Sequence, residues 1–135
     1  MFKAALVAFA AFMIAPIGIA NGQPSDAQRG AKLFGVNCFQ CHGRDGSGGI
    51  APKLTGPGNA ASWPFERFRG AVLAGYGERN RPLNEIMPHF GYVKIAPSGR
   101  IPTDDELRAI QAYLKSVGAT PAPSPVVIQD RASRS

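Results

Sequence analysis

Apolar residues recur at helical spacing near both ends of this 135-residue chain. The first such segment follows Ser25, which has with Gln28 the spacing of a capping box. Its apolar face consists of Ala27, Gly30, Ala31, Phe34 and Cys38. Side chains that recur every three or four residues lie on one face of a helix, so the pattern predicts a helix from about residue 26 to 38.

A second amphipathic helix is predicted from residue 103 to 118. Thr103 and Glu106 have the capping-box spacing, and Gly118 is a stop signal. The apolar stripe consists of Leu107, Ile110, Leu114 and Val117, with Tyr113 beside it. A weaker pattern predicts a central helix over 65–74, with Ser62 near its start and Gly75 at its end.

Between these helices the chain is rich in turn residues. Residues 43–61 contain six Gly and two Pro, and a similar mixture runs through 75–102. We predict a short strand at Val93–Ile95. The fold class is therefore all-α with long loops, a combination that commonly needs a buried cofactor to fill its core.

The two ends of the chain differ in composition from the single domain predicted between them. Lys3 precedes an apolar run over 4–15 and small residues before Ala20, which predicts an export signal over 1–20, cleaved near Ala20. The run falls short of the roughly 20 residues that a membrane anchor needs, so no stable anchor is expected. Residues 21–118 form the predicted domain, and 119–135 a Pro- and Ser-rich disordered tail.

The chain is basic, with a net charge of +6. Export and the lack of a Lys/Arg run argue against nucleic-acid binding. Attraction of acidic protein partners is the better interpretation.

The chemistry is concentrated in Cys38-Phe39-Gln40-Cys41-His42, a C-x-x-C-H motif. Two thiols at this spacing can add to the two vinyl groups of one haem, and the histidine can then bind its iron. A disulfide would not require His42, a thioredoxin-like pair should lie near a β-α-β unit, and zinc would need a fourth ligand. Haem attachment is therefore the favoured interpretation.

A stable electron carrier also needs a second axial ligand. Met87 is the only methionine after the export signal, and it lies in a loop directly before Pro88. We predict His42 and Met87 as the iron ligands, with His89 as the rival to Met87. Simple core packing is the alternative for a lone methionine.

The segment from about Asp26 to Gly118 resembles the bacterial class I, monohaem c-type cytochromes. It has the attachment motif near its start, a methionine loop downstream and a final helix containing Ala112-Tyr113-Leu114. The resemblance implies one covalent haem c and a fold of three to five helices. It also implies that the first and last helices cross, with Gly30, Phe34 and Tyr113 at the crossing.

The same resemblance implies roles for residues around the haem. Pro52 would accept a hydrogen bond from the proximal histidine through its carbonyl, and Leu54 would pack on the haem. Trp63 would donate to a propionate, with core packing as an equal alternative. A turn proline is the alternative for Pro52.

The expected function is a monomeric periplasmic single-electron carrier, not an enzyme. Acidic redox proteins are the expected partners. The resemblance extends to small cytochromes that accept electrons from periplasmic quinoprotein dehydrogenases, so such a dehydrogenase is one candidate partner. A terminal oxidase is another. A bound cytochrome subunit of a dehydrogenase or oxidase, and a catalytic or gas-binding haem protein, are the alternatives. The basic residues near the methionine loop could meet propionates, a partner or only solvent: Arg67, Arg69, Arg79, Arg81, Lys94 and Arg100.

Overall fold

The computed structural model describes residues 24–119, and this part of the chain is all-α. Its elements in chain order are α1 (Asp26–Asn37), α2 (Phe39–His42), the 3-10 helix η1 (Ala60–Ser62), α3 (Phe65–Ala74), the 3-10 helix η2 (Glu78–Asn80) and α4 (Asp104–Ala119). The predicted fold class and its three main helices are confirmed. The export signal and nearly all of the predicted tail lie outside the described residues. Within 24–119, no helix combines the length and apolar character needed to cross a membrane.

Both predicted capping boxes form. The Ser25 hydroxyl accepts from the Gln28 amide at 3.3 Å, while the Ser25 amide donates to the Gln28 side chain at 2.9 Å. At α4, the Thr103 amide donates to the Glu106 carboxylate at 2.8 Å, and the Glu106 amide donates back at 3.3 Å. These bonds satisfy amides that a helix start otherwise leaves without partners.

Helix α3 begins at Phe65 and ends at Ala74, as predicted. Its N-cap is Pro64, and Ser62 belongs instead to η1, which ends before α3 begins. Proline is suited to a helix start because it has no amide hydrogen to leave unsatisfied. The end is as predicted: Gly75 adopts the left-handed conformation, with φ of 73°, and closes the helix.

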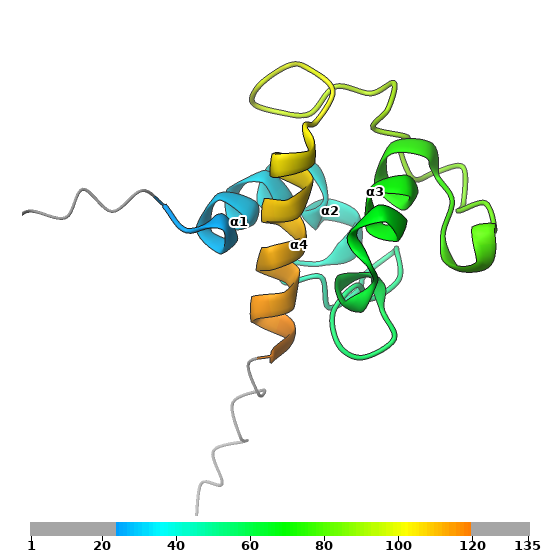
Figure 1. Cartoon of the computed structure of the whole chain (residues 1–135), viewed down its shortest axis with the longest axis horizontal. Coiled ribbons are helices and arrows are strands. Elements are labelled where there is room, and N and C mark those ends of the chain that lie inside the picture. The colour runs from blue at the N-terminus through cyan, green and yellow to red at the C-terminus, as the bar shows by residue number, and fades with distance from the viewer. Residues whose placement is uncertain (1–23, 120–135) are drawn as a thin grey trace, which may run out of the picture.

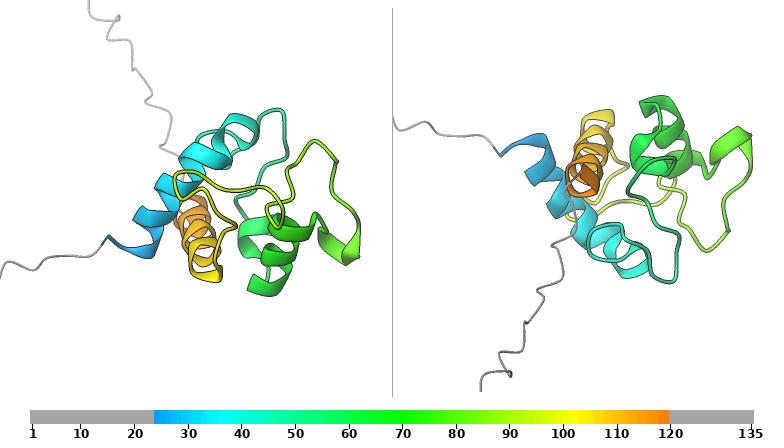
Figure 2. Two further views of the ribbon diagram at one scale, coloured as in Figure 1. Left: turned by 90° about the horizontal axis from the view of Figure 1, so that it is seen from above. Right: turned by 90° about the horizontal axis from the view of Figure 1, so that it is seen from below.

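Helix α4 lies between α1 and α3, and α1 crosses it (Figures 1 and 2). The crossing is close because Gly30 has no side chain: a Cβ there would overlap the Ala109 carbonyl. The Phe34 and Tyr113 rings meet beside it, with centroids 5.5 Å apart. The buried core surrounds this crossing and consists of Phe34, Ala61, Phe68, Leu107, Ile110 and Leu114.

The predicted strand at Val93–Ile95 is wrong. The amides of Tyr92 and Val93 both donate to the His89 carbonyl, which curls the chain into a turn. Only an isolated bridge joins Ile95 to Arg100. The β-branched residues that suggested a strand have no neighbouring strand to pair with among residues 24–119.

Candidate haem site

The C-x-x-C-H motif occupies the junction of α1 and α2. The Cys38 amide donates to the Phe34 carbonyl and so ends α1. The Cys38 carbonyl then accepts from the Cys41 amide at 3.3 Å and from the His42 amide at 3.0 Å. This single turn places Cys38 at the N-cap of α2, and Cys41 and His42 at the last two positions of that helix.

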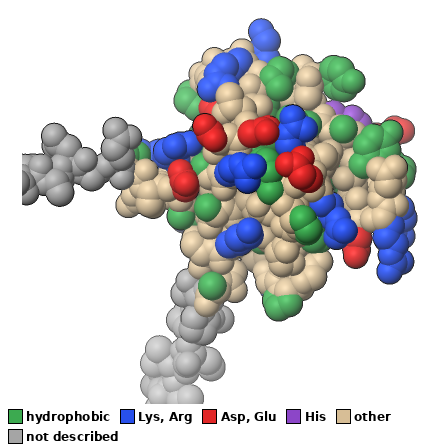
Figure 3. All heavy atoms as spheres, viewed as in Figure 1, with side chains coloured by type: hydrophobic (Ala, Val, Ile, Leu, Met, Phe, Trp, Pro, Cys, Tyr) green, Lys and Arg blue, Asp and Glu red, His purple; other side chains and the backbone are tan. Residues whose placement is uncertain are grey.

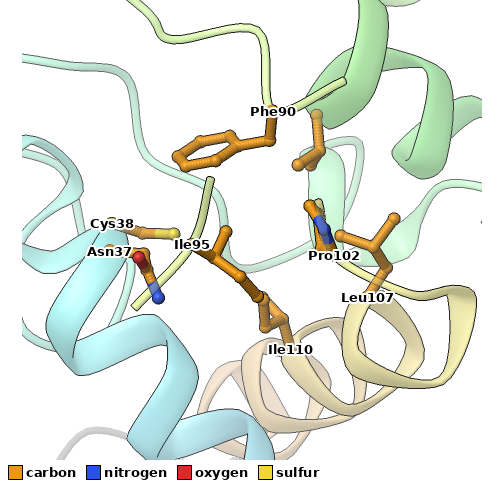
Figure 4. Close-up of a pocket in the computed structure, with 8 residues that line it drawn as sticks. Asn37, Cys38, Phe90, Ile95, Pro102, Leu107 and Ile110 are labelled. Carbon is orange, nitrogen blue, oxygen red and sulfur yellow. The ribbon is translucent and has the colours of Figure 1, made fainter. Parts of the chain in front are cut away.

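The Cys38 sulfur points into an apolar pocket beneath the Phe90 ring (Figure 4). The pocket is lined by Asn37, Cys38, Val72, Phe90, Ile95, Pro102, Leu107 and Ile110. Burial, with a smaller contribution from the neighbouring Cys41, raises the pKa of the Cys38 thiol to about 12. Surroundings of this kind suit a neutral sulfur and oppose a thiolate.

His42 is buried, with 7% of its surface exposed, and its Nδ1 lies 2.9 Å from the Pro52 carbonyl oxygen. A carbonyl can only accept, so the proton must be on Nδ1 and the imidazole donates it. In the neutral ring this leaves Nε2 with a free lone pair. The histidine is thereby held in the tautomer that can bind a metal through Nε2.

These residues fit a haem. A neutral sulfur in apolar surroundings suits a thioether, and His42 offers one nitrogen to iron. The competing interpretations fit less well: no three His, Cys, Asp or Glu side chains among residues 24–119 come together as a metal site, as structural zinc would require. The helices described here also contain no β-α-β unit of the thioredoxin kind.

The remaining predicted site residues lie on other segments. Leu54 is half-buried and packs against the core. The Trp63 indole donates to the Gly58 carbonyl at 3.3 Å, so its N–H has a protein partner. Met87 is half-buried on the loop before Phe90, and Phe90 is the residue of that loop that reaches the Cys38 pocket.

His89, the rival ligand, lies against the end of α3. Its imidazole edge occupies the space where a Cβ of Gly75 would stand.

Asn37 is a site residue that the sequence did not reveal. Its side-chain NH2 group donates to the Ala96 carbonyl at 2.9 Å, and its side-chain oxygen accepts from the Ala96 amide at 2.9 Å. The pair ties the segment after the methionine loop to the residue directly before Cys38. Because the partners are 59 positions apart, no local pattern could have indicated the contact.

The basic residues near the methionine loop are not all available to a ligand or partner. Arg69 pairs with Asp104 at 2.7 Å, and Arg100 pairs with Glu106 at 2.9 Å. Arg67 lies over the Trp63 ring. Among the described residues, Arg79, Arg81 and Lys94 take part in no ion pair.

Comparison with known proteins gives three findings. Residues 27–118 match the family "Cytochrome c". The chain is 28% identical over 111 residues to "Cbb3-type cytochrome c oxidase subunit CcoP" of Rhodobacter capsulatus, an alignment that covers 73% of this chain but only 32% of that subunit. The chain thus spans about a third of the length of that relative.

Among solved structures, the chain resembles cytochrome CL from the marine methylotrophic bacterium Methylophaga aminisulfidivorans. The identity is 21% and the TM-score 0.48, over 68% of this chain and 55% of that one. The family match takes in well over half of the chain and contains the C-x-x-C-H motif at Cys38–His42. This chain therefore belongs to the cytochrome c family, whose members bind haem c covalently and use it to transfer electrons.

Proposed function

We propose that the protein is a periplasmic carrier of single electrons, and not an enzyme. The observation that carries the proposal is the buried His42, held by Pro52 in the tautomer that offers Nε2 to iron, one turn after Cys38. The haem supplies the redox chemistry, because its iron can alternate between the ferric and ferrous states. The protein residues hold the haem, set its electronic surroundings and keep water away.

Each residue has a distinct part in this proposal. Cys38 and Cys41 bind the haem vinyl groups as thioethers, and His42 is the proximal ligand. The Pro52 carbonyl orients the imidazole and raises its basicity. Met87 is the second ligand, and its neutral thioether favours the reduced state.

The surroundings of the pocket support a carrier rather than a catalyst. The groups that line it are almost all apolar, and Phe90 covers the Cys38 sulfur. An apolar enclosure lowers the reorganisation that accompanies electron transfer and offers no general acid or base to a substrate. Leu54 and Trp63 are proposed to pack around the haem, with the Trp63 N–H donating to a propionate after leaving Gly58.

Optical spectra of the purified protein in both redox states test this function. The intact mass should first show one added haem. The oxidised protein should then display the sulfur-to-iron charge-transfer band, and the reduced protein should bind carbon monoxide weakly. Met87→Ala should abolish the band, lower the potential and open the iron to carbon monoxide. Rapid carbon monoxide binding by the unaltered protein would favour a catalytic or gas-binding role instead.

A permanently bound cytochrome subunit is the second candidate. The relative from Rhodobacter capsulatus is an oxidase subunit by name, and the chain corresponds to about a third of its length. Gentle purification from the native source distinguishes the two candidates. A carrier should elute as a monomer once moderate salt screens its charges, whereas a subunit should still co-purify in constant ratio with a dehydrogenase or oxidase.

A further inference from the structure

The loop that carries Met87 is fastened at both ends to the carboxyl end of α3. The Leu83 amide donates to the Gly75 carbonyl at 2.7 Å. On the other side of Met87, the amides of Phe90 and Gly91 donate to the carbonyls of Val72 and Leu73, both at 2.9 Å. The last carbonyls of a helix lack partners within the helix, and here the methionine loop supplies them.

Two close contacts make this attachment specific. The edge of the His89 imidazole lies on Gly75, where a Cβ would overlap Nε2 and stand 2.6 Å from Cδ2. A Cβ on Gly91 would stand 2.6 Å from the Leu73 carbonyl oxygen. Glycine at both positions is therefore what lets the loop approach the helix end so closely. A side chain at either position would push the two apart.

Asn84 shapes the loop between its two attachments. Its side-chain oxygen accepts from the Ile86 amide at 3.0 Å, and its carbonyl accepts from the Met87 amide at 3.0 Å. Met87 is thus the last residue of a hydrogen-bonded turn that begins at Asn84, directly after Leu83, and the Leu83 amide is itself bound to Gly75. Asn84 therefore holds the backbone of Ile86 and Met87 between the two attachments.

We propose that the carboxyl end of α3 is the anchor of the methionine loop and that His89, seated on Gly75, is a positioning residue for Met87. His89 is then not a ligand: its ring is directed at the helix end and acts through the position of the loop. The inference rests on the proposed binding of iron by Met87. It adds that the strength of this bond is set by contacts at Gly75 and Gly91, rather than by the methionine alone.

Titration of the ferric holoprotein with imidazole tests the anchor. Imidazole can bind the iron only when Met87 leaves, so its apparent dissociation constant reports how often the loop opens. His89→Ala removes the ring from Gly75, and Gly91→Ala forces the loop away from Leu73. Each should retain the charge-transfer band yet bind imidazole about tenfold more tightly, which corresponds to an open loop about tenfold more populated.

Gly70→Ala is the matched control. Gly70 lies in α3, and nothing stands within 4 Å of its Cβ position. The imidazole affinity of Gly70→Ala should therefore equal that of the unaltered protein. His89→Gln, which refills part of the space, should lie between His89→Ala and the unaltered protein. This variant and His89→Ala carry the test if Gly91→Ala does not accumulate with haem.

The outcomes separate this inference from the proposed function. If the unaltered protein lacks the charge-transfer band, Met87 is not a ligand and the proposed function is at fault. If the band is present but His89→Ala and Gly91→Ala bind imidazole no more tightly than Gly70→Ala, the anchor is refuted while the ligand stands. An equal gain in all three variants would also refute it, because the effect would not depend on the contacts with the loop.

Discussion

One backbone oxygen decides the chemistry that His42 can perform. The Pro52 carbonyl accepts the Nδ1 proton at 2.9 Å and so selects one of two tautomers. Proline suits this role because its ring restricts φ, so fewer backbone conformations compete with the one that presents the carbonyl to His42. A side-chain acceptor would add rotamers that the site would have to restrain. The motif C-x-x-C-H thus needs a partner ten residues away, in a loop with no periodic pattern.

Glu106 is a second residue whose state is set by its neighbours. Burial by itself raises the pKa of its carboxyl group, but hydrogen bonds from the Thr103 amide and hydroxyl and the charge of Arg100 outweigh burial. The net effect places the pKa below its ordinary value of 4.5. A carboxyl whose pKa is lower in the folded chain than in the unfolded chain stabilises the fold in its ionised form.

Glu106→Gln should therefore destabilise the holoprotein in a pH-dependent way. At pH 7 we expect a loss of about 1 kcal/mol in the free energy of unfolding, because Gln retains the cap with Thr103 but loses the charge opposite Arg100. The loss should be constant above about pH 5 and should shrink as the pH falls through 4.5 and below, because the wild-type carboxyl group is then protonated. Guanidinium denaturation at several pH values measures it. A difference that persists unchanged at the lowest pH would contradict the assignment.

At the scale of elements, the crossing of α1 and α4 depends on a position without a side chain. Gly30→Ala would place a Cβ on the Ala109 carbonyl, and backbone cannot move aside as a flexible side chain can. We expect a loss of about 2–3 kcal/mol in the free energy of unfolding of the holoprotein. Gly35→Ala is the control, since it lies in α1 with nothing within 4 Å of its Cβ position. It should be neutral or stabilise by about 0.5–1 kcal/mol. Equal effects of the two substitutions would show that helix propensity, and not the crossing, is what is measured.

The elements that the sequence predicted are those whose causes are local. Ser25 with Gln28, and Thr103 with Glu106, are three positions apart, so the caps could be identified before the structure. The fold class followed from the same helical spacing. The attachment motif could also be identified, because its two cysteines and its histidine lie within one turn of chain.

The features that the sequence did not predict depend on distant partners. Asn37 holds Ala96 across 59 positions, and His89, in a loop, reaches Gly75 at the end of α3. Val93 and its neighbours have the composition of a strand, but the His89 carbonyl captures two amides and curls the chain. Turn-rich loops carry little periodicity, so their course is set by whichever helix end or side chain satisfies their amides.

At the scale of the whole molecule, positive charge is less concentrated than the composition implies. Acidic and basic side chains are interspersed over the face seen in Figure 3, and Arg69 and Arg100 are paired with carboxylates. Arg79 and Arg81 lie in the exposed turn around η2, which the Tyr76–Pro82 bridge closes. Arg79 has a left-handed φ of 56°, an uncommon conformation for a residue with a side chain.

Exposed apolar side chains accompany the methionine loop. Ile86 and Tyr92, which flank Met87 in the sequence, are 81% and 86% exposed. Apolar contact can hold a partner briefly, while charge brings it to the correct face. We therefore expect the turn at 78–81 to guide the encounter with an acidic partner, and the other basic residues to contribute less.

The rate of electron transfer to a small charged oxidant tests this expectation without a natural partner. With the ferricyanide anion the rate should fall as salt rises, because exposed charges are screened beyond about 10 Å at 0.1 M. Arg79→Glu with Arg81→Glu should slow the reaction several-fold at low salt and weaken its salt dependence.

The control is Lys32→Glu with Lys115→Glu, on α1 and α4. This pair changes the net charge equally and should have a smaller effect on the rate. Hexaammineruthenium, a cation, should respond with the opposite sign. If both pairs of substitutions change the anion's rate equally, only net charge matters, and the docking face is not at this turn.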